Sequence, residues 1–330
     1  MLRTLSVLAT VFLLAFSAGQ LLAQGPEIID PAEAAKDPDF LIQGEYLGQG
    51  GGAASLEGKV GVQVIARGGG KFQAFVLKGG LPGEGWKNGD PRSGIEGKRE
   101  GDKVTLKGDK FAATIAGGKL TLTTADGQGK AELERVQRKS PTLGATPPQG
   151  ALVLFDGTDA KHFPDGHMTA DKNLMGGCVT ADKFNDYHLH VELRLSYMPN
   201  AQGQARSNSG VYLHDCYEIQ VLDSFGLEGL NNECGGVYSI QAPKVNMCLP
   251  PLVWQTYDVD FTAPKYDAAG KKTADARATV LHNGVVIHED YQIPHGTPGR
   301  QPEGPGPRPL HLQGHGNKVE FRNVWVVEKK

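Results

Sequence analysis

The sequence predicts an all-β protein in which a small β-sandwich or barrel-like domain precedes a two-sheet sandwich of the jelly-roll type. Short runs with the period-two alternation of strands recur along the chain. The 45 glycines and the low aromatic content of 7% indicate many turns. Long helical periodicity is missing throughout the sequence, so no helical layer is expected.

Length and charge limit the domain count and the class of partner. At roughly 100–200 residues per domain, 330 residues predict two domains. The formal net charge is −3, and no stripe of Lys and Arg with interleaved aromatic residues appears in the sequence. Both observations argue against a nucleic-acid partner.

Residues 1–23 have the pattern of a secretory signal peptide. Arg3 precedes an apolar run from Leu5 to Phe16, and small or apolar residues then lead to Ala23. The run is too short to span a bilayer, and no later stretch approaches roughly 18 unbroken apolar residues. We therefore expect cleavage near Ala23 and a secreted or periplasmic protein without a membrane span.

Residues 25–137 predict a small all-β domain. Glycine-rich turns separate short runs, and the alternation of Leu and Thr over 120–123 is typical of a half-buried strand. The polar residues of this region form no catalytic constellation, so we expect a packing, spacing or docking role. The expected strands are 60–67, 72–78, 103–107, 111–116, 119–124 and 131–136.

Residues 138–149 have the composition of a linker, because they are polar, contain three prolines and show no hydrophobic period. The segment 150–330 then predicts a sandwich of many antiparallel strands. Asn283-Gly284 between two apolar runs is a strong signal for a two-residue hairpin turn. The expected strands are 152–155, 187–195, 209–213, 217–222, 236–239, 255–261, 276–281, 285–289, 310–313 and 319–327.

All four cysteines lie in the C-terminal half, and export would let disulfides persist. We expect a disulfide between Cys234 and Cys248, because the enclosed segment is short and rich in loop residues. Cys178 and Cys216 are then expected as buried free thiols. A structural zinc site is disfavoured, since no pair of cysteines has the spacing of two to four residues that such sites use.

The first candidate site lies on the expected strand near residue 218. Glu218 and Gln220 share one face of that strand, and Asp223 joins the same face only if a bulge intervenes. Carboxylates that face a sugar can act as general acid, base or nucleophile. The structural alternative is a buried ion pair of Glu218 with Arg194 or Arg322.

A second polar row occurs near the C-terminus, where His311, Gln313 and His315 alternate with Leu310, Leu312 and Gly314. A histidine can transfer protons near neutral pH, and an amide can hold a hydroxyl group. A divalent metal held by His311 and His315 is a further option, although no carboxylate follows at ligand spacing. The function depends on this row and the strand near 218 converging on one surface.

At these residues the chain resembles the 3-keto-disaccharide hydrolase domain family, whose members have a concanavalin A-like lectin/glucanase sandwich. One departure is Gly314, where the family often has Asp, which removes one candidate ligand or acid. The resemblance leaves residues 25–137 uncovered. The matching pieces are 152–157, 208–212, 217–224, 235–238, 254–258, 283–284, 312–316 and 321–325.

The resemblance implies an enzyme that cleaves sugars already oxidised at C3 by a separate dehydrogenase. A ketone at C3 acidifies the C2 hydrogen, so elimination followed by addition of water can break the glycosidic bond. This chemistry needs a base, an acid at the leaving oxygen, and donors or a metal to stabilise the enolate. The resulting hypothesis assigns Glu218 or His311 as base, His315 as acid, Gln220 and Gln313 as sugar-binding amides, and Asn208, Tyr212 and Asp223 as pocket-lining residues.

Two other functions fit the same sequence. A lectin-like module would use the polar rows for binding alone. An ordinary retaining glycoside hydrolase would use Glu218 and Asp223, which requires their carboxyl groups to lie about 5 Å apart.

Overall fold

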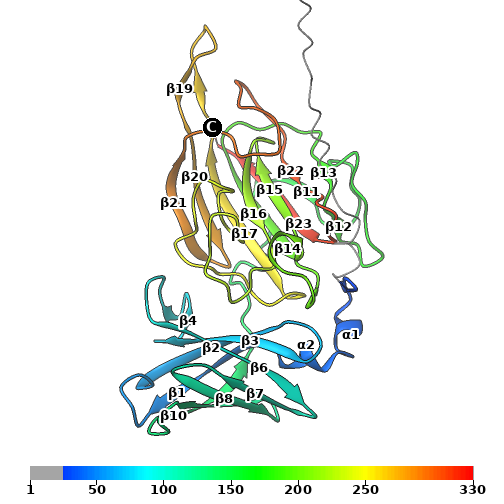
Figure 1. Ribbon diagram of the computed structural model, residues 1–330. Coiled ribbons are helices and arrows are strands. Elements are labelled where there is room, and N and C mark those ends of the chain that lie inside the picture. The colour runs from blue at the N-terminus through cyan, green and yellow to red at the C-terminus, as the bar shows by residue number, and fades with distance from the viewer. Residues whose placement is uncertain (1–24, 330) are drawn as a thin grey trace, which may run out of the picture.

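The computed structural model describes residues 25–329 and contains a closed barrel followed by a two-sheet sandwich (Figure 1). The predicted all-β fold class is therefore confirmed. The expected signal peptide, 1–23, lies outside the described residues. Among the described residues, no helix is both long and apolar enough to cross a membrane.

The N-terminal barrel closes eight antiparallel strands in the order β1-β10-β9-β8-β7-β6-β3-β2. Two short helices, α1 (Pro31–Ala34) and α2 (Pro38–Ile42), precede it, and each begins after an Asp N-cap. A buried apolar core fills the barrel. The strands are β1 (Gly44–Gly51), β2 (Gly58–Ala66), β3 (Lys71–Lys78), β6 (Arg92–Glu100), β7 (Lys103–Lys107), β8 (Phe111–Ala116), β9 (Lys119–Thr124) and β10 (Lys130–Val136), and the short β4 (Leu81–Pro82) and β5 (Gly85–Trp86) pair beside them.

The sequence did not predict β1 and β6, because both strands contain several glycines. Some of these glycines are required by close strand contacts. A Cβ at Gly48 would lie 2.2 Å from the carbonyl oxygen of Glu132, and one at Gly97 would lie 1.8 Å from that of Thr105. Barrel closure therefore selects glycine where strand propensity alone disfavours it.

The C-terminal sandwich packs a larger sheet, in the order β11-β23-β14-β17-β20-β21 with β12 beside β23, against a four-stranded sheet in the order β13-β22-β15-β16. A continuous apolar core lies between the two sheets. The larger sheet contains β11 (Leu152–Phe155), β12 (Leu174–Met175), β14 (Tyr187–Arg194), β17 (Trp254–Thr262), β20 (Ala276–His282), β21 (Val285–Ile293) and β23 (Glu320–Glu328). The smaller contains β13 (Cys178–Val179), β15 (Ser209–Leu213), β16 (Tyr217–Val221) and β22 (His311–Leu312), and β18 (Lys265–Tyr266) and β19 (Lys272–Ala274) form a separate pair.

Two local expectations have opposite outcomes. The hairpin at Asn283-Gly284 is confirmed, since it joins β20 to β21 with φ angles of 51° and 76° at its two central residues. The expected strand 236–239 is wrong, because Val237 makes only isolated bridges to Ile219 and Gln241. That segment instead closes a turn against β16.

The expected linker, 138–149, is packed against the outer face of the larger sheet. Thr142 donates to Asp258 at 2.6 Å and shares a hydrogen bond with Thr256 at 2.8 Å. The backbone N–H of Gly144 donates to the Glu192 carboxylate. The segment is therefore an ordered strap, and its polar residues satisfy polar groups of the sheet.

Buried polar contacts join the barrel to the sandwich. Arg206 donates to the Asp223 carboxylate at 2.6 Å and to the carbonyl oxygen of Ala66 in β2 at 3.4 Å. Tyr197 donates to Asp37 at 2.9 Å, and its side chain belongs to the barrel core. The two units therefore share an interface that contains both apolar packing and a buried ion pair.

All four cysteines are buried free thiols in the structure. This agrees with the expectation for Cys178 and Cys216 and corrects the expected disulfide between Cys234 and Cys248. The fold brings that pair of thiols into hydrogen-bonding contact, and Cys234 also contacts the Tyr257 hydroxyl at 3.2 Å. Both thiols are buried in the apolar core between the two sheets.

Candidate active site

The candidate site lies on the outer face of the four-stranded sheet, where three strands bring polar side chains into one row. Tyr212 in β15 is the cross-strand partner of Glu218 in β16 on one side and of His311 in β22 on the other. Their neighbours Val211, Ile219 and Leu312 point into the core. Polar and apolar side chains thus alternate along these strands as the sequence predicted. This alternation places the two predicted polar rows on the same surface of the sheet.

Hydrogen bonds connect this row. The Tyr212 hydroxyl donates to Glu218 Oε2 at 2.7 Å and accepts from Gln313 Nε2 at 3.3 Å. The rings of Tyr212 and His311 are 5.2 Å apart. Gln313 Oε1 and His311 Nδ1 are buried and have no hydrogen-bond partner among the described residues. Unpartnered buried polar atoms are rare in native folds, and a bound ligand could supply the missing hydrogen bonds of these two.

Gly210 provides the space for the Glu218 carboxyl group. A Cβ at Gly210 would lie 2.4 Å from Glu218 Oε1 and 2.9 Å from the carboxyl carbon. The Glu218 side chain therefore lies directly over the backbone of β15. Any larger residue at position 210 would displace it.

The environment of Glu218 alters its acidity. Only 3% of the residue is exposed. Burial raises the pKa of Glu218 to about 7, and the hydrogen bond from Tyr212 offsets only part of this increase. A carboxyl group with a pKa near neutrality can both accept and return a proton under ordinary conditions, as general acid–base catalysis requires.

A loop between β21 and β22 forms the wall beside β16. Thr297 Oγ1 accepts from the backbone N–H of Glu218 at 2.9 Å, and Thr297 N donates to the carbonyl oxygen of Cys216 at 2.9 Å. Gly299 follows, and a Cβ there would lie 3.5 Å from the Tyr212 hydroxyl. Segment 296–301 thus continues the sheet surface past its edge strand and encloses the Glu218 carboxyl group.

Arg300, from this loop, places a positive charge beside the row. It makes a two-pronged contact with Asp215, with distances of 2.7 and 2.8 Å, and Asp215 lies 3.5 Å from His311 Nδ1. Asp215 and His214 form the turn between β15 and β16 and have φ angles of 50° and 55°. Residues other than glycine rarely adopt a positive φ angle, so the Arg300 contact fixes a strained turn next to the site.

His311 is held in its neutral form. Burial and the nearby Arg300 charge lower the pKa of His311 to about 4, although the Asp215 carboxylate acts in the opposite direction. At neutral pH its ring can donate or accept a hydrogen bond, but it is a much weaker base than Glu218.

The amides predicted to bind sugar have different positions. Gln220 Nε2 donates to Gln204 Oε1 at 3.1 Å, and Asn208 Nδ2 donates to the same oxygen at 3.2 Å. Both amides are buried behind the loop that carries Gln204. Gln313 alone lies in the row with Tyr212, so Gln220 and Asn208 support the end of the site nearest the barrel.

Two predicted residues lie outside the cluster. Asp223 accepts from Arg206 at 2.6 Å in an ion pair that is almost fully buried at the barrel junction. His315 is exposed after β22, and in the described part of the chain no hydrogen bond or ion pair holds its ring. The bulge that Asp223 would need to rejoin the Glu218 face is absent, because β16 pairs with β15 without a register shift and ends at Val221.

The structural alternative for Glu218 is wrong. Arg194 pairs with Glu320 at 2.6 Å, and Arg322 pairs with Glu192 at 2.7 Å, both on the larger sheet. Glu218 lies on the other sheet and has Tyr212 as its hydrogen-bond partner. The carboxyl group is therefore not neutralised by either arginine.

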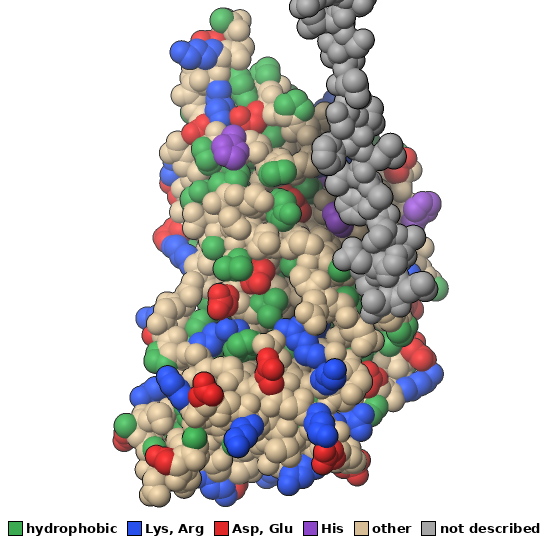
Figure 2. Space-filling model, viewed as in Figure 1, with side chains coloured by type: hydrophobic (Ala, Val, Ile, Leu, Met, Phe, Trp, Pro, Cys, Tyr) green, Lys and Arg blue, Asp and Glu red, His purple; other side chains and the backbone are tan. Residues whose placement is uncertain are grey.

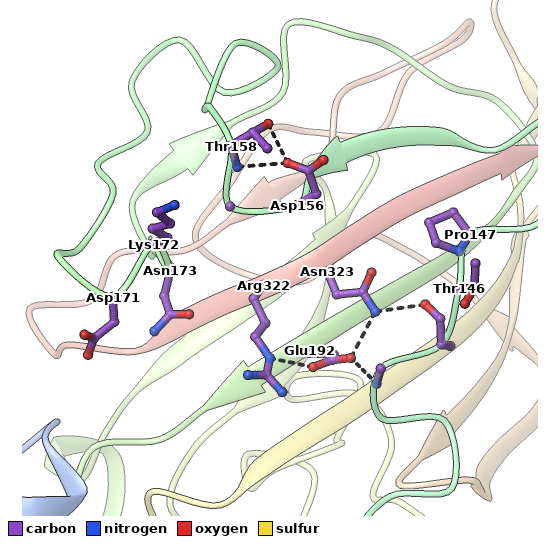
Figure 3. Close-up of a pocket in the computed structure, with 13 residues that line it drawn as sticks. Thr146, Pro147, Asp156, Thr158, Asp171, Lys172, Asn173, Glu192, Arg322 and Asn323 are labelled. Carbon is purple, nitrogen blue, oxygen red and sulfur yellow. Dashed lines mark hydrogen bonds and ion pairs between the residues drawn. The ribbon is translucent and has the colours of Figure 1, made fainter.

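A hollow of about 590 Å³ lies elsewhere on the sandwich, between the strap and the outer face of the larger sheet (Figure 3). Figure 3 shows Glu192 surrounded by Arg322, Asn323 and the backbone of the strap. Burial raises the pKa of Glu192, but hydrogen bonds from His190, Asn323 and Arg322 outweigh it and bring the pKa to about 2. This carboxylate is therefore ionised and fully partnered, so Glu192 is not prepared for proton transfer.

The side chains of the candidate row do not form a metal-ligand set. Within residues 25–329, no three His, Cys, Asp or Glu side chains converge to hold a metal ion. His311 has one carboxylate neighbour, Asp215, and that carboxylate already forms an ion pair with Arg300. The donor set of the row therefore does not fit a divalent metal.

Three functional features were missed from the sequence. They are Gly210, Asp215 and Arg300. Asp215 and Arg300 carried no recognisable signal, because their roles depend on a contact between two loops that are distant in the chain. The Asn208-Ser-Gly stretch before an alternating strand could have drawn attention to Gly210, since an isolated glycine in a strand often marks close approach of another group.

Comparisons with known proteins agree with the fold of residues 150–327. The model of the 3-keto-alpha-glucoside-1,2-lyase-like domain matches residues 150–327. Among solved structures, the chain is similar to a candidate glycosyl hydrolase from Parabacteroides distasonis ATCC 8503, with 30% identity, a TM-score of 0.50, and coverage of 55% of this chain and 85% of that chain. A second candidate glycosyl hydrolase from the same organism is 20% identical, with a TM-score of 0.41 and coverage of 55% and 95%.

No curated protein matches the chain. The family match spans more than half of the residues and confirms the resemblance drawn from the motifs. This chain belongs to the family of the 3-keto-alpha-glucoside-1,2-lyase-like domain.

Proposed function

We propose that this protein is a carbohydrate-active enzyme that cleaves glycosidic bonds of 3-keto-glycosides by elimination followed by hydration. The observation that carries the proposal is the buried Glu218 carboxyl group, with its pKa of about 7, in a row with Tyr212 and the unpartnered Gln313 and His311 atoms. Membership of the family and similarity to a candidate glycosyl hydrolase support it.

In the proposed reaction, Glu218 removes the C2 proton of a sugar that carries a ketone at C3. The electrons of the C2–H bond form an enolate with the C3 oxygen. They then form a C1=C2 double bond as the bond from C1 to the glycosidic oxygen breaks and that oxygen gains a proton. Water adds to C1 and a proton returns to C2, so the net change is hydrolysis.

The side chains of the row match these requirements. Glu218 is the better base, because its pKa of about 7 exceeds that of His311, which burial and the Arg300 charge lower to about 4. The Arg300 guanidinium is the cation of the row and would stabilise the enolate by electrostatics. Gln313 would bind a sugar hydroxyl group through its free oxygen.

The acid for the leaving oxygen is assigned to His315, which is exposed in the segment that follows β22. We also infer secretion or a periplasmic location from the N-terminal signal pattern. The substrate must be made by a separate dehydrogenase that oxidises C3, since the proposed elimination and hydration involve no net oxidation or reduction.

Incubation with matched disaccharides, one carrying a C3 ketone and one unoxidised, tests the proposal. We expect release of the reducing-end sugar from the ketone alone, and loss of release with Glu218→Gln. The exposed variant Glu132→Gln is the control, because it removes a carboxylate from the barrel surface.

Release from both sugars would instead support an ordinary hydrolase, although Asp223 is already committed to Arg206. Binding without release would support a lectin-like module. Retention of full turnover by a folded Glu218→Gln variant would eliminate the assigned base.

A further inference from the structure

A hollow of about 660 Å³ lies on the outer face of the barrel, where the barrel meets the sandwich. The barrel strands β3 and β6 and the segment before β3 supply Arg67, Lys71, Gln73, Glu96 and Lys98, and the sandwich supplies Gln202. Figure 1 shows β2 and β3 on the side of the barrel nearest the sandwich. The hollow is thus built by both parts of the chain.

Charge distinguishes the barrel from the rest of the protein. Residues 44–139 contain 16 Lys or Arg and 11 Asp or Glu, an excess of five positive charges in a chain whose net charge is −3. Figure 2 shows Lys and Arg side chains gathered over the barrel on the visible face. Within the hollow, three basic side chains stand against the single carboxylate of Glu96.

The basic side chains of the hollow are available to a ligand. Lys71 and Lys98 are exposed, and Lys98 is paired only with the exposed Glu100, at 2.8 Å. Arg67 is half-buried and donates to Gln73, whose own amide donates to Glu96 at 3.2 Å. A row of planar side chains beside two lysines suits carboxylate or sulfate groups and neighbouring hydroxyl groups.

The hollow is connected to the candidate active site through one short loop. Gln202 lines the hollow, and two residues later Gln204 accepts hydrogen bonds from Gln220 and Asn208 at the end of the site nearest the barrel. Arg206, in the same loop, anchors it to β2 through Ala66. The loop therefore fixes the barrel hollow next to the sugar-binding face.

The family match leaves the barrel uncovered, since the match begins at residue 150. We propose that the barrel provides a binding subsite for an anionic glycan, one carrying carboxylate or sulfate groups, so that the enzyme acts on an acidic oligosaccharide longer than a disaccharide. This inference rests on the proposed function for the identity of the reaction, but binding at the barrel is measurable without it.

Calorimetric titration of the full chain tests the subsite with four probes: a hexameric oligogalacturonate, a sulfated oligosaccharide, neutral maltohexaose and a short single-stranded oligonucleotide. We expect one or both acidic saccharides to bind more tightly than maltohexaose and the oligonucleotide. The two acidic probes distinguish carboxylate from sulfate. Equal binding of the oligonucleotide would show a general attraction for polyanions and would overturn the proposal, as would failure of both acidic saccharides to bind.

Charge-reversal variants locate the binding. Lys71→Glu combined with Lys98→Glu should weaken binding of the acidic saccharide by about tenfold, because two exposed contacts become repulsive. Lys119→Glu combined with Lys130→Glu is the matched control, since it makes the same charge change at exposed, ion-paired lysines elsewhere on the barrel. Equal weakening in both double variants would overturn the assignment to the hollow.

Cleavage of the 3-keto disaccharide separates this inference from the proposed function. The Lys71/Lys98 double variant should retain it, because a disaccharide does not need the barrel subsite. Binding of the acidic probe without any cleavage would support the barrel subsite and contradict the proposed reaction. Cleavage of the disaccharide without binding of the acidic probe would support the reaction and contradict the subsite.

Discussion

At the scale of single residues, the cost of burying Glu218 is the clearest physical sign of function. A carboxyl group that lies over a glycine, almost out of contact with water, disfavours its own ionisation. Such a group destabilises the fold at the pH values where it is charged. Proteins retain an arrangement of this kind where the perturbed acidity is used.

We therefore predict that Glu218→Gln stabilises the protein at high pH. The pKa of Glu218 is raised to about 7 from 4.5, so its protonated form favours folding, and this advantage is lost as pH rises through about 7. Above that pH the variant should gain about 3 kcal/mol over the parent protein. Denaturant unfolding at pH 5 and pH 8 measures the difference. Glu132→Gln, at an exposed site, should show none, and a pH-independent effect of Glu218→Gln would contradict the raised pKa.

Gly210 leads to a second prediction. Gly210→Ala should lower turnover of a 3-keto disaccharide on the order of 10²-fold, because the added methyl group meets Glu218 Oε1 and displaces it. Steady-state kinetics of the folded variant provide the measurement. Gly51→Ala is the control, since a Cβ there meets nothing within 4 Å. Unchanged turnover in Gly210→Ala would show that the position of the carboxyl group is not critical.

At the scale of elements, the segment 296–301 behaves as an additional edge of the four-stranded sheet. Thr297 bonds to the backbone on both sides of Tyr217, and Arg300 holds the strained turn at Asp215. Neither contact could be read from the sequence, because this Pro- and Gly-containing loop has no strand pattern and lies far from β16 along the chain.

Removing the Arg300 charge should change the acidity of His311. Arg300→Gln is expected to raise the pKa of His311 from about 4 toward its ordinary value, because a nearby cation is lost and the Asp215 carboxylate is left to act alone. Titration of the His311 ring by NMR measures the shift. Arg308→Gln, in the same loop, should leave it unchanged. A fixed His311 pKa in Arg300→Gln would mean that burial alone sets its value.

Strand prediction succeeded where side chains alternate and failed where glycine replaces them. The limits of β7, β8, β9, β11 and β15 agree with the expected ranges, since short alternating or continuous apolar runs mark these strands in the sequence. The strap was predicted as a linker because its contacts, such as that of Thr142 with Asp258, depend on a sheet formed by distant residues. Local composition does not contain this information.

At the scale of the whole molecule, the Arg206–Asp223 pair couples the barrel to the sandwich. Asp223→Asn should destabilise the protein by about 3–5 kcal/mol, because it leaves the Arg206 charge buried and uncompensated. Denaturant unfolding measures the loss, and Asp260→Asn, which breaks an exposed pair with Lys329, is the control. We expect unchanged turnover per folded molecule. A rise in KM at normal stability would instead restore Asp223 as a substrate-binding residue.

The sequence by itself determined the all-β class, the order of most strands, the family of residues 150–327 and the polar rows near Glu218 and His311, since alternation and short motifs are local properties. Only the tertiary structure decided that Tyr212 joins the two rows, that Gly210 makes room for the carboxyl group, and that Asp223 belongs to the barrel junction. These facts depend on strand register and on which loops cover an edge. Both are fixed by packing between segments that are distant in the chain.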